Sequence, residues 1–456
     1  MAANIDEDKV FRTNNRLCYF SNNGAHLAVA FQSNLLIKDA KTFDTRHSFI
    51  FADVIQCMEW SPNSEYILCA NIRKAIIQVY SVHHPQWKCK LIEGSAGLQS
   101  VAWSPDSKCI LTTADFNIQI SIWNLQDQTV WYIQNLKTSA FDKLCFSPSG
   151  IRLAVIVTEE NKNTVEIYKT DSWKISRKLI CDRLRSIDGI RWSPNDELLC
   201  IWCSSTAEPK LIVYSTVWER HVVAFSPLEI AQSTAHSSER KLKGIESIEW
   251  IPSGQLLAVI GFNEVIVLLN YVTWTPLSQL YLDPVIRDCN YLTKVYKECT
   301  DSGNNPNKCI VSCNERVLRE IHERPIYIEI GKKDSSDNFS VAKVNLLEFS
   351  TCGQYLAVKH ELYPTTLWIW DIFTDYLDYL QLENPVTAIK WSPIRPQLLV
   401  FSERTARVYE WSRKGARILP MSKYTSVIDA HWHPTGDKVA LCGYNKAMIY
   451  EITDIP

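Results

Sequence analysis

Several features that would indicate other classes of protein are scarce or missing in this sequence of 456 residues. It has only 14 Gly and 4 Met, and no apolar run reaches the roughly 20 residues that a membrane helix needs. The longest apolar stretch, residues 256–272, is interrupted at residues 261–264 and predicts a buried β-hairpin instead. The 48 Lys and Arg nearly balance the 50 Asp and Glu, so no global field attracts nucleic acid or an anionic membrane. A local basic patch stays compatible with this balance.

Signals for secretion and for catalysis are also missing. The N-terminus has no positively charged start followed by an apolar core, so we expect no signal peptide. The 15 Cys are then expected to be reduced in a cytosolic protein, where they act mainly as small buried hydrophobes. The sequence contains no Gly-x-Ser-x-Gly, Walker, Gly-x-Gly-x-x-Gly or His-Glu-x-x-His motif. We therefore predict neither an enzyme nor a cofactor site.

Aromatic residues are abundant, and many of them belong to one recurring pattern. The 16 Trp and 19 Tyr favour strands, because aromatic rings fit a pleated, half-buried surface. In the pattern an apolar residue, one further residue and an aromatic precede Ser-Pro, a polar turn and a short apolar run. Pro starts the turn and cannot donate to a sheet ladder, so each copy ends one strand and begins another. The aromatic of the nine copies is Phe20, Trp60, Trp103, Phe146, Trp192, Trp250, Phe349, Trp391 and Trp432.

The spacing of these copies predicts the fold. Most copies follow one another after 40 to 46 residues, with longer intervals of 58 and 99 residues before Trp250 and Phe349. Each period predicts a second strand, as in residues 66–69, a third, as in residues 118–123, and a fourth. Four short antiparallel strands per period are typical of WD-repeat β-propellers. We therefore predict an all-β WD-repeat β-propeller of about nine four-stranded blades across residues 1–456. A second aromatic set is expected to open the fourth strands, at Phe43, Trp87, Trp131, Trp173, Trp218 and Trp274.

The repeats differ in detail from the usual WD signature. Only Trp370-Asp371 has the Trp-Asp ending, and no Gly-His dipeptide occurs. The buried His/Asp network of typical WD blades is thus predicted to be largely missing, so the packing of apolar strands must supply the stability. The chain ends on a third-type strand at residues 447–450, and we expect residues 10–12 to complete the last blade. A single ring of nine blades fits the count best, with an extra degenerate blade or two unequal rings as alternatives.

The period lapses in two places. Residues 275–343 are predicted to form an irregular insertion between the sixth and seventh repeats, with loop-like segments at 301–308 and 331–337 around a strand at 326–330. A smaller polar insertion covers residues 232–243. Loops of this kind often carry binding residues, but a variable surface loop without function is an equally weighted interpretation.

Four cysteines in the large insertion are candidate ligands of a zinc ion. A structural zinc ion needs four nitrogen or sulfur ligands that converge tetrahedrally. These residues lack paired Cys-x-x-Cys knuckles, so we do not predict a metal site there. The residues concerned are Cys289, Cys299, Cys309 and Cys313, with His322 nearby.

Other candidate residues also have stronger structural interpretations. Cys200 and Cys203 lie in a predicted second strand, whereas redox Cys-x-x-Cys pairs open a helix, so we expect core cysteines. His431 and His433 share one face of a strand, but no thiol or carboxylate lies at useful spacing. The periodic Trp residues of the fourth strands could form a recognition rim, but recurrence once per blade favours packing. We therefore predict no catalytic, cofactor or metal residues and assign no partner-binding residues.

Three stretches resemble one particular family within the WD-repeat superfamily. They are PQWKCKLIEGSAGL at residues 85–98, which leads into WSPD, LLNYVTW at residues 268–274, and VYKE at residues 295–298. They are similar to the centrosomal WD-repeat protein eight family, which is encoded antisense to the p-seventy-three gene. The most discriminating segment, residues 93–97, stands where Gly-His would begin an ordinary repeat. The insertion at residues 275–343 matches this family poorly.

The resemblance implies a non-enzymatic scaffold in the cytoplasm, at centrosomes, centriolar satellites and spindle poles. It implies a coiled-coil anchoring partner of the synovial-sarcoma-breakpoint-interacting type and, in fungi, a minus-end-directed kinesin. Such a scaffold tethers microtubule minus ends and supports spindle organisation and cilium assembly. The main alternative is an RNA- or translation-associated propeller, which predicts an electropositive face and salt-dependent binding. An unrecognised enzyme would need titratable groups that converge in the central channel.

Overall fold

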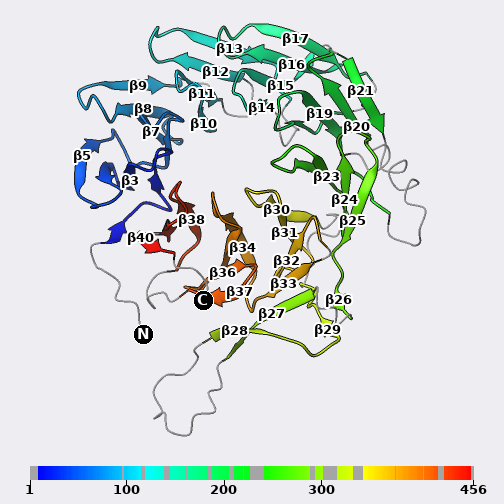
Figure 1. Cartoon of the computed structure of the whole chain (residues 1–456). Helices are drawn as coiled ribbons and strands as arrows, with labels where there is room; N and C mark the ends of the chain where they lie inside the picture. The colour runs from blue at the N-terminus through cyan, green and yellow to red at the C-terminus, as the bar shows by residue number, and fades with distance from the viewer. Residues whose placement is uncertain are drawn as a thin grey trace, which may run out of the picture. The chain divides into compact units, whose positions relative to one another are not determined.

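The structure is a computed structural model, and its described residues are built from β-strands without an α-helix (Figure 1). The described part contains no helix that could serve as a membrane span. The described ranges are 9–94, 97–114, 119–137, 144–159, 162–182, 184, 186–204, 210–218, 220–225, 241–287, 293–300, 316–331, 343–374, 376–403, 405–419 and 426–452.

The strands form nine sheets of the blade type, which confirms the predicted nine-bladed WD-repeat β-propeller fold. Eight of these sheets have four strands, and one has six. By their internal contacts the residues divide into two compact units, Ser21–Tyr281 and Met1–Phe20 with Leu282–Pro456. We call these the central unit and the terminal unit, and each is described by itself.

Blades one to six follow one another along the chain (Figure 1). The first is β2 (Cys18–Phe20), β3 (His26–Phe31), β4 (Asn34–Asp39) and β5 (Thr45–Ile50). The second is β6 (Cys57–Trp60), β7 (Tyr66–Asn71), β8 (Ile76–Ser81) and β9 (Lys88–Ile92). The third is β10 (Ser100–Trp103), β11 (Cys109–Thr113), β12 (Gln119–Asn124) and β13 (Val130–Gln134). The fourth is β14 (Leu144–Phe146), β15 (Arg152–Glu159), β16 (Lys162–Lys169) and β17 (Ile175–Ile180). The fifth is β18 (Gly189–Trp192), β19 (Leu198–Cys203), β20 (Lys210–Ser215) and β21 (Arg220–Phe225). The sixth is β22 (Ser247–Trp250), β23 (Leu256–Ile260), β24 (Val265–Asn270) and β25 (Pro276–Tyr281).

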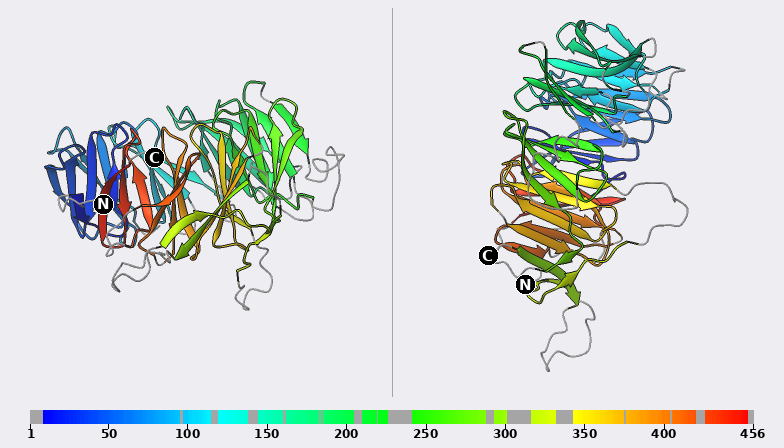
Figure 2. Two further views of the ribbon diagram at one scale, coloured as in Figure 1. Left: turned by 60° about the horizontal axis from the view of Figure 1, so that its bottom comes forward. Right: turned by 90° about the vertical axis from the view of Figure 1, so that its right-hand side faces the viewer.

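The last three blades lie in the terminal unit, and Figure 2 shows their strands from two further sides. The seventh is β30 (Val344–Phe349), β31 (Tyr355–His360), β32 (Thr366–Asp371) and β33 (Leu377–Gln381), to which β27 (Thr293–Thr300) and β28 (Arg316–Glu320) are added. The eighth is β34 (Val386–Trp391), β35 (Gln397–Ser402), β36 (Val408–Ser412) and β37 (Gly415–Ile418). The ninth is β38 (Asp429–Trp432), β39 (Lys438–Cys442), β40 (Lys446–Glu451) and β1 (Val10–Arg12). A separate pair joins β26 (Val285–Ile286) to β29 (Ile326–Tyr327).

The ninth blade confirms that the N-terminal strand completes the last blade. β1 pairs antiparallel with β40, with Val10 opposite Met448. An ion pair of 3.1 Å between Lys9 Nζ and Glu451 Oε1 holds the same two strands together. The predicted hairpin at residues 256–272 is also confirmed, because β23 and β24 are its two buried strands.

The Ser-Pro turns fold locally through one conserved arrangement of the backbone. Ser61 Oγ accepts a hydrogen bond of 2.9 Å from the Tyr66 backbone N–H and donates one of 2.7 Å to Asn63 Oδ1. The fourth residue after the repeated aromatic has a positive φ in eight copies, and it is Gly, Ser or Asp in all of them. Gly meets no Cβ penalty in this region and Asp can enter it, whereas Ser64 and Ser107 adopt it against their steric preference. The eight residues are Gly24, Ser64, Ser107, Gly150, Asp196, Gly254, Gly353 and Gly436, with φ between 62° and 75°.

The repeated aromatic joins each blade to the one before it. In four blades the indole N–H of this residue donates to a backbone carbonyl on the first strand of the preceding blade, just before that blade's own aromatic. The rings therefore recur because they both fill the space between blade faces and satisfy a buried carbonyl. The bonds run from Trp103 to Glu59 (3.3 Å), Trp192 to Cys145 (2.9 Å), Trp391 to Glu348 (3.1 Å) and Trp432 to Lys390 (3.3 Å).

A buried polar network in the third blade replaces the His/Asp network of ordinary WD repeats. Glu93, directly after β9, is buried, and its Oε1 accepts hydrogen bonds from the Thr112 hydroxyl and from Trp123 Nε1, the latter at 2.9 Å. Residue 93 stands where the Gly-His motif normally begins, and the sequence did not predict this role for it. The Glu93 carboxylate satisfies two donors at once.

The insertion between repeats six and seven contains two strands, β27 and β28, that the sequence did not predict. β25 is the fourth strand predicted after Trp274, and it completes the sixth blade although it lies inside the range 275–343 assigned to the insertion. β27 pairs parallel with β33, and β28 pairs antiparallel with β27, which makes the seventh blade six-stranded. The strand expected at residues 326–330 is only the two-residue β29. The predicted loop at 301–308 lies outside the described residues, and so does all of the predicted loop at 331–337 except Gly331.

Candidate partner-binding pocket

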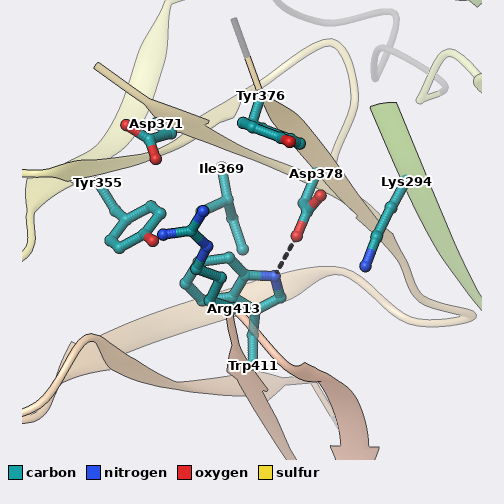
Figure 3. A pocket seen from close by; sticks show the side chains of 8 residues that line it. All are labelled: Lys294, Tyr355, Ile369, Asp371, Tyr376, Asp378, Trp411 and Arg413. Carbon is teal, nitrogen blue, oxygen red and sulfur yellow. Dashed lines mark hydrogen bonds between the residues drawn. The ribbon is translucent and has the colours of Figure 1, made fainter. Parts of the chain in front are cut away.

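A pocket of about 270 Å³ lies between the seventh and eighth blades of the terminal unit (Figure 3). Three strands of the seventh blade, the added strand β27 and the end of β36 supply its walls. Aromatic rings, two carboxylates and two cations face it together. The lining residues are Lys294, Tyr355, Ile369, Asp371, Tyr376, Asp378, Trp411 and Arg413.

The registers of the strands bring these side chains to one face. Tyr355 is opposite Asp371, and Ile369 is opposite Asp378. The Tyr355 ring packs edge-on against Trp411 of the next blade, with centroids 5.2 Å apart. Burial raises the pKa of Tyr355, so its hydroxyl stays a neutral donor and acceptor at physiological pH. The aromatic contacts fix one wall of the pocket.

The two carboxylates differ in what holds them. Asp378 accepts a hydrogen bond of 2.8 Å from Trp411 Nε1, and burial raises its pKa to about 6. Trp411 and the nearby Lys294 oppose this rise but do not cancel it. Asp371 accepts from Gln354 Nε2 at 2.8 Å and from the backbone N–H of Phe373 at 3.1 Å. The turn therefore fixes the Asp371 carboxylate, whereas the protonation state of Asp378 can change with pH or when a ligand binds.

The cations come from two different elements. Lys294 lies on the added strand β27, directly opposite Asp378 in the parallel register. Arg413 follows β36, and its guanidinium carbon lies 6.0 Å from the centre of the Tyr376 ring, a cation–π geometry. In Figure 3 the Arg413 guanidinium lies between Tyr355 and Asp378, whereas Lys294 lies on the other side of Asp378. The insertion thus contributes one wall of the pocket.

A buried carboxylate fixes β27 in this position. The Glu298 side chain is 1% exposed, and Arg407 Nη1 donates to its Oε1 at 2.6 Å. Its Oε2 accepts from the Tyr409 hydroxyl at 2.9 Å and from the Glu383 backbone N–H at 3.0 Å. Three donors on the seventh and eighth blades therefore satisfy one carboxylate of the insertion, as buried charges require.

The arrangement is suited to recognition. Its volume falls below the roughly 300–1,000 Å³ of typical small-molecule sites, so it fits a single side chain of a partner. The carboxylates of the pocket can bind a positively charged side chain of a partner, and its cations can bind a negatively charged one. The aromatic rings supply apolar contact. None of the described lining residues is a Ser, Cys or His, so no nucleophile–base pair of the hydrolase type faces the space.

The structure describes only part of the cysteines that the sequence offers as candidates. Cys289, Cys309 and Cys313 lie outside the described residues, and Cys299 is partly buried on β27. Cys200 and Cys203 are both buried in β19 but belong to different core clusters, because residues three apart on a strand point to opposite faces. Their assignment as core cysteines is confirmed.

The two histidines of β38 and its following turn serve the repeat. His431 packs 4.1 Å from the Tyr19 ring, and burial lowers its pKa to about 4. His433 stands where most other copies have Ser, and its Nδ1 lies 2.6 Å from Thr435 Oγ1 in the turn. Asp437 Oδ1 lies 3.4 Å from His433 Nδ1 and Asp429 Oδ2 lies 3.9 Å from His431 Nε2, so the expectation that no carboxylate lies at useful spacing is wrong. Within the described ranges no group of three His, Cys, Asp or Glu residues could hold a metal ion.

The periodic Trp residues mostly pack, as predicted. Trp173 is buried, and Trp87, Trp131 and Trp274 lie partly buried against the core clusters of their blades. Trp218 is the exception, because 64% of it is exposed. Arg220 lies over its ring at 5.4 Å. The prediction therefore fails at one blade, which exposes an aromatic surface that the others bury.

Comparison with known proteins supports the fold and relates the chain to one family. The model of the WD domain, G-beta repeat matches residues 87–124, which hold the Glu93 network. The chain is 31% identical to the mouse WD repeat-containing protein WRAP73 over 445 residues, or 94% of this chain and 92% of the mouse protein. It is 19% identical to an uncharacterized WD repeat-containing protein of Schizosaccharomyces pombe, over 81% of this chain and 73% of that protein.

A solved structure shows the same fold. The crystal structure of the C-terminal WD40 domain of Sif2 matches with a TM-score of 0.50 and 12% identity, and the match covers 97% of each chain. This likeness concerns architecture alone. None of these matches names a catalytic family.

Proposed function

Because the chain belongs to the family of the WD repeat-containing protein WRAP73, we propose that it is a non-enzymatic scaffold of centrosomes and spindle poles. It assembles with a coiled-coil anchoring protein of the synovial-sarcoma-breakpoint-interacting type. The assembly tethers microtubule minus ends and supports spindle organisation and cilium assembly. A minus-end-directed kinesin is a further partner of the same assembly. The observation that carries this proposal is the similarity along nearly the whole chain, joined to the family resemblance noted in the sequence.

The pocket between the seventh and eighth blades is the proposed contact for one partner side chain. Its mixed charges and aromatic rings favour a protein surface over a metabolite. The insertion strand β27 supplies Lys294 and is fixed by Glu298, so the insertion is part of the binding surface.

Proximity labelling in dividing cells tests the proposed function. The tagged full-length chain is expected to label centrosomal and microtubule-anchoring proteins, the coiled-coil partner among them. A labelled set that holds ribosomal and RNA-binding proteins instead would favour the RNA- or translation-associated alternative.

A pull-down of the coiled-coil partner then tests the pocket. The double variant Lys294→Ala and Arg413→Ala removes both cations and is expected to weaken capture. The matched control is Tyr444→Ala, an exposed aromatic residue of the same unit outside the pocket. Equal capture by both variants and the native chain would rule the pocket out as the contact while leaving the scaffold function intact.

A further inference from the structure

A second inter-blade cavity, in the central unit, has only cations at its charged positions. Its volume is about 260 Å³, and it lies between the fourth and fifth blades. Strands β15, β16 and β17 supply one side, and the end of β20 supplies the other. No carboxylate lines it among the residues that the structure describes. The lining residues are Arg152, Ile167, Lys169, Ser176, Arg177, Tyr214 and Thr216.

This cavity occupies the same place in its blade as the pocket of Figure 3. Arg152 pairs with Lys169 as Tyr355 pairs with Asp371. Likewise, Ile167 pairs with Arg177 as Ile369 pairs with Asp378. Lys169 and Arg177 thus stand where the other pocket has its two carboxylates. Since both blades have the same strand pairing, the fold does not require either sign of charge there.

Nearby carboxylates are engaged elsewhere. Glu166 is the register partner of Lys178, on the opposite face of the sheet from the Ile167–Arg177 pair, and its Oε1 lies 2.8 Å from Lys178 Nζ. The Asp196 carboxylate accepts from the backbone N–H of Ser149 at 3.2 Å. Among the described residues, the side chains of Arg152 and Lys169 make no hydrogen bond or ion pair. Arg152 and Lys169 are like charges beside one small cavity, so they repel one another, and an anion bound between them would relieve this.

The cations are also the donors that an anion would meet. Ser176 Oγ donates to the Ile167 carbonyl at 2.9 Å, and Thr216 Oγ1 donates to the Asp196 carbonyl at 3.0 Å. Their hydroxyl protons are therefore already used. Each arginine offers several N–H donors in a planar fork that matches two oxygens of one phosphate.

Exposed apolar residues follow the cavity lining on the fifth blade. Val217 and Trp218 come directly after the lining residue Thr216 in the sequence, and each is 64% exposed. A free inorganic ion makes no use of exposed apolar side chains, whereas a residue that flanks a charged residue in a peptide does.

We propose that this cavity binds the phosphate group of a phosphorylated Ser or Thr in an extended segment of a partner protein. A phosphate monoester carries about −1.5 to −2 charges at pH 7 and three acceptor oxygens, which suits three surrounding cations better than a single carboxylate does. The exposed Val217 and Trp218 would contact a residue next to the phosphorylated one. This binding does not depend on where in the cell the chain acts.

Binding of degenerate peptide libraries to the full chain tests the site. One library has a fixed phosphoserine, a second has unmodified serine and a third has glutamate at that position. We expect the phosphoserine library to bind at least about tenfold more tightly than either of the others, and to lose at least about tenfold with Arg152→Gln and Arg177→Gln together. The matched control, Lys88→Gln with Lys90→Gln, removes two exposed positive charges from β9 and should leave binding unchanged.

A further variant and a competition experiment also test whether the cavity binds the phosphate group. Arg177→Lys keeps the positive charge but loses the planar guanidinium donors, so it should weaken binding less than the double variant Arg152→Gln and Arg177→Gln does. Circular dichroism checks that the double variant is still folded. Equal binding of the serine or glutamate library, or equal loss in the Lys88 and Lys90 control, would overturn the proposal. Competition by single-stranded RNA that depends on Arg152 and Arg177 would assign the cavity to nucleic acid instead.

Discussion

The hydrogen bonds of Glu298 give the sharpest stability prediction, because they join the insertion strand β27 to two blades through a buried charge. We consider Glu298→Gln, which keeps the size of the side chain and removes its charge. Arg407, Tyr409 and the backbone N–H of Glu383 all donate to the native carboxylate. A carboxamide has one acceptor oxygen and an NH₂ group, so its nitrogen must face at least one of these donors.

The magnitude follows from the exposure of the partners. Breaking a fully buried ion pair costs about 3–5 kcal/mol. The Arg407 side chain is 32% exposed, so water can partly solvate the guanidinium after the change. We therefore expect a loss of about 1.5–3 kcal/mol, the value of a hydrogen bond to a charged group. Since 1.4 kcal/mol is tenfold, β27 should open about 10 to 150 times more often.

Hydrogen exchange of peptides that cover β27 measures this opening, with peptides of β24 as the internal reference. The control is Glu320→Gln on the adjacent strand β28, where the carboxylate is 37% exposed and makes only a 3.9 Å contact with His322. Its expected effect is below about 0.5 kcal/mol. Exchange of β27 that rises less than about threefold in Glu298→Gln, or equally in both variants, would refute the role assigned to the buried carboxylate.

Three further predictions concern single residues. Trp391→Phe removes the hydrogen bond to the Glu348 carbonyl and should lower the free energy of unfolding by about 1 kcal/mol in urea denaturation. Gly150→Ala should cost more than about 1 kcal/mol in the same assay, because φ is +74° and a Cβ would lie 2.5 Å from Pro105 Cβ. Asp378 has a folded pKa of about 6, above its ordinary 3.8, so its folded form holds a proton that the unfolded chain releases, and stability should fall as pH rises from 4 to 6. Asp378→Asn should flatten this part of the pH profile, which urea midpoints at pH 4 and pH 6.5 would detect.

The blades could be predicted from the sequence because their signals are local. The hydrogen bonds that form a Ser-Pro turn lie within six residues of sequence, as those of Ser61 with Asn63 and Tyr66 show. The aromatic before the turn is marked by its period, although the period alone does not reveal the bond to the preceding blade. Local turn chemistry and a regular spacing therefore suffice to place nearly all of the strands.

The added strands could not be predicted in this way. β27 pairs in parallel with β33, whose residues come about 80 positions later, and no short turn connects the two. A parallel partner leaves no hairpin signal in the sequence. The role of Glu93 was missed for a related reason, since a single carboxylate has no visible partner until Thr112 and Trp123 fold against it.

The two inter-blade pockets show how a repeated fold acquires distinct surfaces. The paired positions on the third and fourth strands are the same in both, yet they hold Asp371 and Asp378 in one and Lys169 and Arg177 in the other. In the first pocket, Trp411 of the next blade donates to one of the carboxylates, so part of the charge serves packing between blades. In the second pocket, Arg152 and Lys169 have no such partner within the described residues. The charges of Arg152 and Lys169 therefore serve no contact between described blades, and this difference is the physical ground for proposing that the basic cavity binds an anionic group.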